Sequence, residues 1–75
     1  MKELLETIAK ALVDAPEQVS VNQIEQGNEI ILELKVAQDD VGKVIGKQGK
    51  IARAIRSVIK AAAIMQNKRV TVEIL

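Results

Sequence analysis

The stretch VGKVIGKQGK, from Val41 to Lys50, holds three of the chain's four glycines together with three lysines. Glycine adopts backbone dihedrals that other residues avoid, and it lets a ligand approach the main chain. A helix is predicted to begin directly after Gly49, and the first N–H groups of a helix are unpaired and carry partial positive charge. The segment from Gly46 to Gly49 therefore predicts an exposed anion-binding turn. A tight corner between two helices, in which the glycines only relieve crowding, explains them equally well.

Helices are predicted on both sides of this turn and at the start of the chain. Apolar residues at helical spacing predict helices over residues 2–13 and from Lys50 to about Gln66. A short helix is predicted to end at Ile45. Asp39 or Asp40 is in position to cap it, and we favour that role over metal binding by the two carboxylates.

Strands are predicted where apolar and polar residues alternate. Residues 19–26 and 29–36 form two strands joined by Gly27-Asn28, a two-residue hairpin signal with glycine first. Residues 70–74 form the last strand. The order helix, strand, strand, helix, helix, strand predicts an α+β fold with a three-stranded sheet and helices packed on one face.

The long helix divides into three stripes at about 100° per residue. The apolar stripe, predicted to be buried, consists of Ile51, Ala54, Ile55, Val58, Ile59, Ala62 and Met65. The basic stripe on the opposite side consists of Lys50, Arg53, Arg56 and Lys60. Between them lies a stripe of mostly small residues with one large aliphatic side chain, made of Ala54, Ser57, Ala61 and Ile64, followed by Lys68.

Charge is distributed unequally along the 75 residues, whose net charge is only +1. Residues 1–40 carry three lysines and nine acidic residues, a net charge of −6, whereas residues 41–75 carry eight basic residues and one acid, a net charge of +7. Such asymmetry indicates an anionic partner for the second half. A solvated basic helix face is the simpler interpretation.

Composition argues against several classes of protein. The chain has no cysteine and no histidine, so a thiolate metal site is excluded and the commonest metal ligand and general base are missing. We therefore expect no enzyme, no metal, no cofactor and no small-molecule substrate. No apolar run approaches the roughly 20 residues of a membrane span, and the first ten residues do not read as a signal peptide. A cytoplasmic protein that does not enter a membrane is the expectation, with residues 1–75 as one domain.

Two nucleotide-binding motifs fail on spacing. A P-loop needs four residues between its glycines, then lysine and a hydroxyl residue. Here Gly42 and Gly46 are separated by three residues, and Lys47 is followed by Gln48. A dinucleotide-binding fingerprint needs another glycine at the position of Val44.

The residues Ile45-Gly46-Lys47-Gln48-Gly49, placed between two helices and preceded by a hairpin, resemble the GXXG loop of a KH domain. The element order resembles the type II KH topology. Over nearly its whole length the chain resembles the small bacterial single-KH-domain proteins of the KhpA family, to which GKQGKIARAIR, from Gly46 to Arg56, is similar. It departs from the common KH pattern at Ala52, where an aliphatic residue usually lines the groove wall.

The resemblance implies a binding site for single-stranded RNA. A KH domain clamps about four nucleotides by their backbone with its GXXG loop while the bases lie over an apolar groove. It implies a clamp made of Gly46, Lys47, Gln48 and Gly49. It also implies that Ile45 borders the groove, and that phosphates are neutralised by three further residues, namely Lys43, Lys50 and Arg53.

The absence of aromatic residues changes how such a site would bind. Base stacking on aromatic side chains, worth roughly 1–3 kcal/mol per base, is not available. We therefore expect binding that is weak, salt-sensitive and tolerant of sequence.

The stripe of Ala54, Ser57, Ala61 and Ile64 has two interpretations. Ile64 is either a single exposed aliphatic residue, which is normal, or part of a helix-mediated dimer seam. The resemblance implies the second, as a homodimer or a heterodimer with a larger KH-containing protein.

Two functions follow from these features. The first is RNA binding as an RNA chaperone or post-transcriptional regulator, for which the resemblance implies a setting of cytoplasmic RNA regulation with links to cell shape and division. The alternative is a protein–protein dimerisation module with little RNA binding of its own. Lysines on both sides of the loop favour the first.

Overall fold

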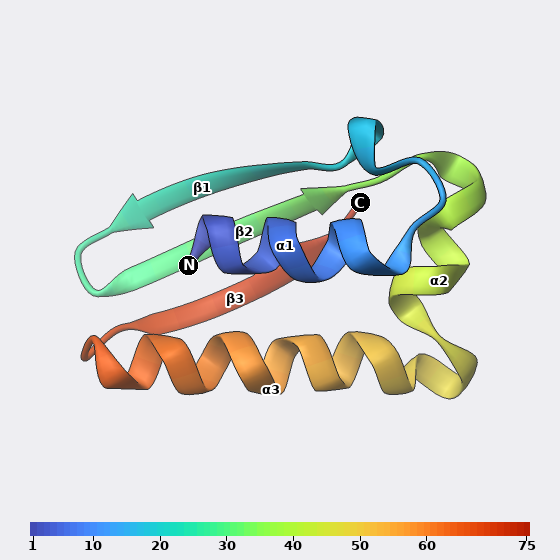
Figure 1. The fold of residues 1–75 in the computed structure, drawn as a ribbon. Coiled ribbons are helices and arrows are strands. Elements are labelled where there is room, and N and C mark those ends of the chain that lie inside the picture. Colours follow the sequence, from blue (N-terminus) through green and yellow to red (C-terminus); the bar gives the residue numbers. More distant parts are fainter.

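The computed structural model describes all residues, Met1–Leu75, and contains one three-stranded sheet with helices on one of its faces (Figure 1). The predicted α+β class and the predicted order of elements are confirmed. The helices are α1 (Lys2–Leu12), α2 (Val41–Ile45) and α3 (Lys50–Met65), and the strands are β1 (Ser20–Gln26), β2 (Glu29–Lys35) and β3 (Arg69–Ile74). Single 3-10 turns occupy Pro16–Gln18, Gln38–Asp40 and Lys47–Gly49.

Strand β2 is the centre of the sheet and pairs differently on its two sides. It runs antiparallel to β1, with Gln26 opposite Glu29 across the predicted two-residue turn. In that turn only Gly27 has a positive φ, +60°, which is what a glycine-first hairpin requires. On its other side β2 runs parallel to β3, which leaves β3 as an edge strand.

The core forms between the sheet and the helices α1 and α3. The alternation in β2 turns Ile30, Leu32 and Leu34 toward the helices, where all three are buried. The helices meet them with buried residues of their own, chiefly Leu5, Ala9, Ile55 and Ile59. Burying each large aliphatic side chain contributes about 1.5–3 kcal/mol relative to exposure, so these contacts hold α3 against the sheet.

The predicted buried side of α3 is partly wrong. Val58 is 50% exposed and Met65 is 86% exposed, and Ala54 is also exposed. The structure buries Ala52 and Ala63 instead. The buried side of α3, made of Ala52, Ile55, Ile59 and Ala63, is therefore rotated relative to the predicted apolar stripe.

The predicted helix cap is also wrong. Asp40 occupies the N-cap position of α2, but its side chain makes no capping hydrogen bond there. Its carboxylate is buried and instead accepts hydrogen bonds from the backbone N–H groups of Asp14 and Ala15, at 3.2 and 3.1 Å. Asp40 therefore fastens the loop after α1 to the start of α2.

Lys43 completes this contact. Its ammonium group pairs with Asp14 and lies 3.6 Å from the carboxylate of Asp40. Burial by itself raises the pKa of Asp40, but the two backbone hydrogen bonds and the charge of Lys43 outweigh burial and bring the pKa below its ordinary value of 3.8. The same ion pairs raise the pKa of Lys43, chiefly through its hydrogen bond to Asp14. We call the contacts among Asp14, Ala15, Asp40 and Lys43 the Asp40 latch.

A close backbone contact between α2 and α3 depends on Gly46. Gly46 has φ +76° and ψ 171°, a conformation that is essentially restricted to glycine. A Cβ atom on Gly46 would lie 2.6 Å from Cγ1 of Ile51 and 2.9 Å from its backbone nitrogen. Gly49 has φ +74° and ψ 15°, with no atom within 4 Å of the place of a Cβ.

We predict that the two loop glycines differ in how well they tolerate alanine. Gly46→Ala combines a forbidden conformation with a backbone clash, so we expect it to lower the free energy of unfolding by about 3 kcal/mol or more. Gly49→Ala causes no clash and only places alanine in a left-handed conformation, so we expect it to lower the free energy of unfolding by about 1–2 kcal/mol. Urea titrations followed by circular dichroism measure both values. Equal costs would contradict this account of the loop.

We predict that the Asp40 latch makes stability depend on pH below about 4. The folded state holds the pKa of Asp40 below that of the unfolded chain, so its contribution is present above pH 3.8 and is lost as pH falls through the lower, folded-state pKa. Asp40→Asn should lower the melting temperature at pH 7. Below about pH 4, the variant should also lose less stability than the parent as the pH falls. Asp39→Asn, at the exposed neighbour, is the matched control and should behave as the parent. Identical pH profiles for both variants would refute the latch.

Candidate functional site

The loop from Gly46 to Gly49 projects at the end of the molecule where α2 meets α3 (Figure 1). Lys47 and Gln48 at its tip are exposed, and Ile45 before it is 37% exposed. Gln48 has φ +58°, a left-handed conformation that costs a residue with a side chain about 1–2 kcal/mol. The loop therefore has the exposure and the tight backbone that the glycines predict.

The basic residues along the loop and α3 lack acidic partners. All the ion pairs in the structure use Lys10, Lys43 or Lys68 as the cation. The cations near the loop, along α3 and at the start of β3 pair with no carboxylate, namely Lys47, Lys50, Arg53, Arg56, Lys60 and Arg69. An uncompensated row of like charge attracts an anionic polymer.

Two of these arginines are held in place by backbone carbonyl groups. Arg53 donates from Nη2 to the carbonyl oxygen of Gln48, at 3.2 Å, and so supports the loop. Arg56 donates from Nε to the carbonyl oxygen of Val72 on β3, also at 3.2 Å. Each guanidinium has five N–H donors, so most of them remain free for an anion.

Lys43 differs from the other predicted phosphate-binding residues. Residues two apart on a helix do not face the same side, so Lys43 and Ile45 point away from each other on α2. Lys43 faces the loop after α1, where the Asp40 latch holds it. The structure thus brings Lys47, Lys50 and Arg53 together at the loop and places Lys43 behind it.

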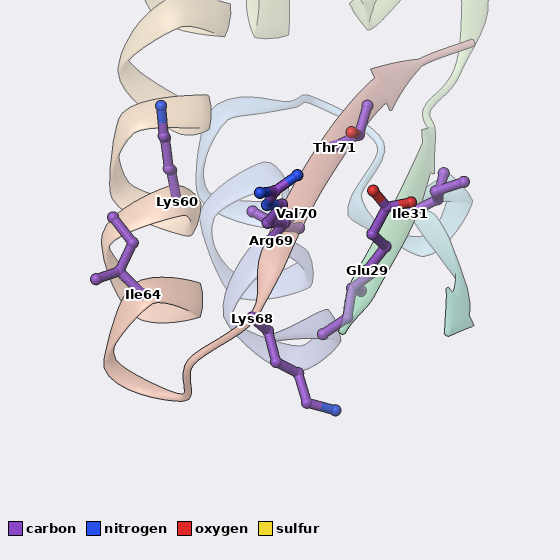
Figure 2. Close-up of a pocket in the computed structure, with 9 residues that line it drawn as sticks. Glu29, Ile31, Lys60, Ile64, Lys68, Arg69, Val70 and Thr71 are labelled. Carbon is purple, nitrogen blue, oxygen red and sulfur yellow. The ribbon is translucent and has the colours of Figure 1, made fainter. Parts of the chain in front are cut away.

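A groove runs between α3 and the free edge of β3. Two adjoining hollows of ≈ 330 and ≈ 420 Å³ share Lys60, Val70 and Thr71 as lining residues. The smaller hollow also contains Arg56, and the larger one, drawn in Figure 2, contains Arg69. We call the two hollows together the α3–β3 groove.

The predicted dimer residues lie elsewhere on α3. Ala54, Ser57 and Ala61 are exposed on the outer side of the helix. Ile64 is 62% exposed and also borders the larger hollow of the α3–β3 groove. A third, almost wholly apolar hollow lies between α1 and α3, where Ile8 and Val58 face each other across it.

Sequence reasoning did not identify several of these features. The sequence predicts Arg56 and Lys60 as part of a basic stripe and not as part of a site, although their helical spacing with Arg53 is a signal for one. The roles of Arg69 and Asp40 depend on contacts between segments far apart in the chain, and nothing in the local sequence indicates them.

Two further observations concern other kinds of site. No helix of this structure combines the length and the apolar character needed to cross a membrane. No three carboxylate, histidine or cysteine side chains lie together as ligands for a metal ion, so Asp39 and Asp40 have no third partner.

Comparison with known proteins finds bacterial relatives that match the chain over its whole length. The chain is 67% identical over 75 residues to the RNA-binding protein KhpA of Clostridium acetobutylicum, with all of both chains covered. It is 65% identical to the protein of the same name from Clostridium perfringens, again over the whole of both chains. It is 45% identical to that of Chlamydia trachomatis, covering 100% of this chain and 96% of the relative. No solved structure matches.

The family comparison covers almost the whole chain. Residues 2–74 match the family described as KhpA/KhpB, KH domain. Neither that description nor the names of the relatives are those of an enzyme. The α+β fold, the exposed turn between α2 and α3 and this match together show that the chain belongs to the KhpA/KhpB KH-domain family.

Proposed function

We propose that the protein binds single-stranded RNA by its backbone at the loop from Gly46 to Gly49. The observation that carries this proposal is the row of unpaired cations beside an exposed loop that is free of carboxylates. The names of the bacterial relatives support it, because they are called RNA-binding proteins.

The loop residues have separate roles in this proposal. Gly46 and Gly49 let a phosphate approach the main chain, and the amide groups at the start of α3 face it with partial positive charge. Lys47, Lys50 and Arg53 neutralise successive phosphates, and Gln48 contributes a neutral hydrogen-bonding group at the tip. Ile45 gives a base an apolar surface on which to rest.

Lys43 acts mainly through structure in this proposal. Its charge is already balanced by Asp14 and Asp40, so an RNA phosphate must displace Asp14 to bind it. Asp40 and Lys43 fix the start of α2 against the loop after α1, and α2 sets the direction in which the glycine loop leaves it.

The proposed binding is weak and tolerant of sequence. The chain has no aromatic side chain, so bases cannot stack on rings and the phosphate contacts supply most of the affinity. Such binding suits an RNA chaperone or a post-transcriptional regulator in the bacterial cytoplasm, where many RNAs must be bound and released.

We predict that acidic residues at the tip of the loop abolish RNA binding. Lys47→Asp with Gln48→Asp places two carboxylates where phosphates would lie, and we expect the affinity for an unstructured RNA to fall by about 100-fold or more. Fluorescence anisotropy with labelled RNA at two salt concentrations measures the affinity, and circular dichroism checks folding.

A matched control separates the loop from general charge. Lys2→Asp with Gln26→Asp makes the same two kinds of substitution at exposed positions near the other end of the molecule. This variant should bind nearly as well as the parent. Equal loss in both variants would mean that net charge, and not the loop, governs binding.

A second proposed function is dimerisation through the outer side of α3. The small residues Ala54, Ser57 and Ala61 allow another helix to approach closely, and exposed aliphatic side chains surround them. Val58 is 50% exposed, Ile64 62% and Met65 86%. Exposed apolar residues gathered on one helix indicate a contact surface, either with a second copy or with a larger KH-containing partner.

We predict that Ile64→Asp makes the protein monomeric. A carboxylate at the seam would lose its hydration without gaining a partner, so the dimer should weaken by about 100-fold or more. Sedimentation equilibrium measures the association. Ile24→Asp, on the uncovered face of the sheet, is the control and should leave it unchanged. A parent protein that is monomeric at high concentration would remove the homodimer from this proposal.

A further inference from the structure

The far end of the α3–β3 groove has a chemistry that the loop does not explain. Its larger hollow, ≈ 420 Å³, lies beside the last turns of α3 and the start of β3, toward the end of α3 that is away from Gly49 (Figures 1 and 2). Its lining includes Lys60 and Ile64 from α3, Arg69 and Thr71 from β3, and Glu29 and Ile31 from β2. We call this hollow the distal hollow.

The distal hollow contains two cations without partners. Neither Lys60 nor Arg69 forms an ion pair, although Arg69 lies opposite Glu29 in the pairing of β2 with β3. Lys68 also lines the hollow, but it is bound to Glu25 at 2.7 Å, and its ammonium group extends away from the other labelled side chains in Figure 2. The unpaired charges of the hollow are therefore the cations of Lys60 and Arg69 and the carboxylate of Glu29, which leaves an excess of positive charge.

Further cations on α3 lie between the distal hollow and the loop. Arg53 lies beside the loop, Arg56 follows about 4.5 Å further along the axis of α3, and Lys60 follows about 6 Å after Arg56. This spacing suits the successive phosphates of an extended strand. On the opposite wall Val70 and Val72 turn their backbone groups away from β2, because alternate residues of a parallel edge strand face outward. Arg56 uses the carbonyl group of Val72, whereas the polar groups of Val70 are available to a base.

We propose that the distal hollow binds a phosphate of the same RNA strand, beyond the roughly four nucleotides that the loop clamps. Lys60 and Arg69 hold the phosphate, the Thr71 hydroxyl donates a further hydrogen bond, and Ile31 and Ile64 flank the attached sugar or base. Glu29 repels a second phosphate and limits the hollow to one. This inference rests on RNA binding at the loop and extends the footprint of that site.

The positive charge of the α3–β3 groove favours an anionic polymer over a peptide as its ligand. A peptide could also add to the free edge of β3, since edge strands accept such partners. The side chains beside that edge are nevertheless mostly cationic, with Arg56, Lys60 and Arg69 unpaired, which favours a polyanion over a peptide of ordinary composition.

The test compares two uridine oligonucleotides, one of about four nucleotides and one about twice as long. Lys60→Gln with Arg69→Gln should weaken the longer RNA by about 10-fold and leave the shorter one unchanged. The slope of log affinity against log salt for the longer RNA should fall by roughly 0.7 for each lost phosphate contact. Lys2→Gln with Lys10→Gln removes the same charge from α1 and should change neither affinity nor slope.

The outcomes separate this inference from the proposal for the loop. If the Lys60 and Arg69 variant binds both lengths as the parent does, or loses both equally, the distal contact is refuted. The loop proposal stands in either case as long as Lys47→Asp with Gln48→Asp abolishes binding of both lengths. Sedimentation of the Lys60 and Arg69 variant must match the parent, because Ile64 borders both the distal hollow and the proposed dimer seam. A change in association that accounts for the lost affinity would also refute the distal contact.

Discussion

The parallel pairing of β2 with β3 requires a long crossover connection, and that connection carries every loop and helix residue of the candidate site. Two parallel neighbours cannot be joined by a tight turn, so the chain must leave the end of β2, cross one face of the sheet and return to the start of β3. The crossover consists of α2, the glycine loop and α3. Because the chain turns back at the loop, α3 runs beside the free edge of β3 and lines the groove with its basic side.

The charged residues of the two halves of the chain have different roles, in the fold for the first half and in the proposed binding for the second. The acidic first half supplies Asp14 and, just before α2, the buried carboxylate of Asp40, which fasten the crossover to the loop after α1. The basic second half has more cations than these acids can reach. Lys43 and Lys68 are paired, and the cations facing the loop and the groove are not. An unpaired cation at an exposed surface destabilises a folded protein only slightly. Because no carboxylate competes for it, such a cation attracts an anionic polymer most strongly.

The loop itself combines rigidity with exposure. Gly46 has no room for a side chain because Ile51 lies against it, whereas Gly49 faces open space. Gln48 adopts a left-handed conformation although it is not a glycine. Strained backbone of this kind persists where the surrounding structure fixes it, and here α2 and α3 fix both ends. Ala52, the residue that departs from the common KH pattern, is on the buried side of α3, and the larger Ile51 lies against Gly46 of the loop.

The sequence by itself determined the order of elements, the hairpin at Gly27-Asn28 and the place of the glycine loop. These features depend on local periodicity and on backbone conformations that few residues can adopt, and both can be read from neighbouring residues. It also placed Lys47, Lys50 and Arg53 near the loop, since they are within a few residues of it. Only the tertiary structure decided which side of α3 is buried, because the angle at which a helix meets a sheet depends on side chains from α1 and β2 as well as its own. For the same reason it alone showed that Asp40 binds the loop after α1 and that Lys43 is held there too, since these contacts join residues that are far apart in the chain. It also showed that Lys60 and Arg69, on different elements, line the same hollow.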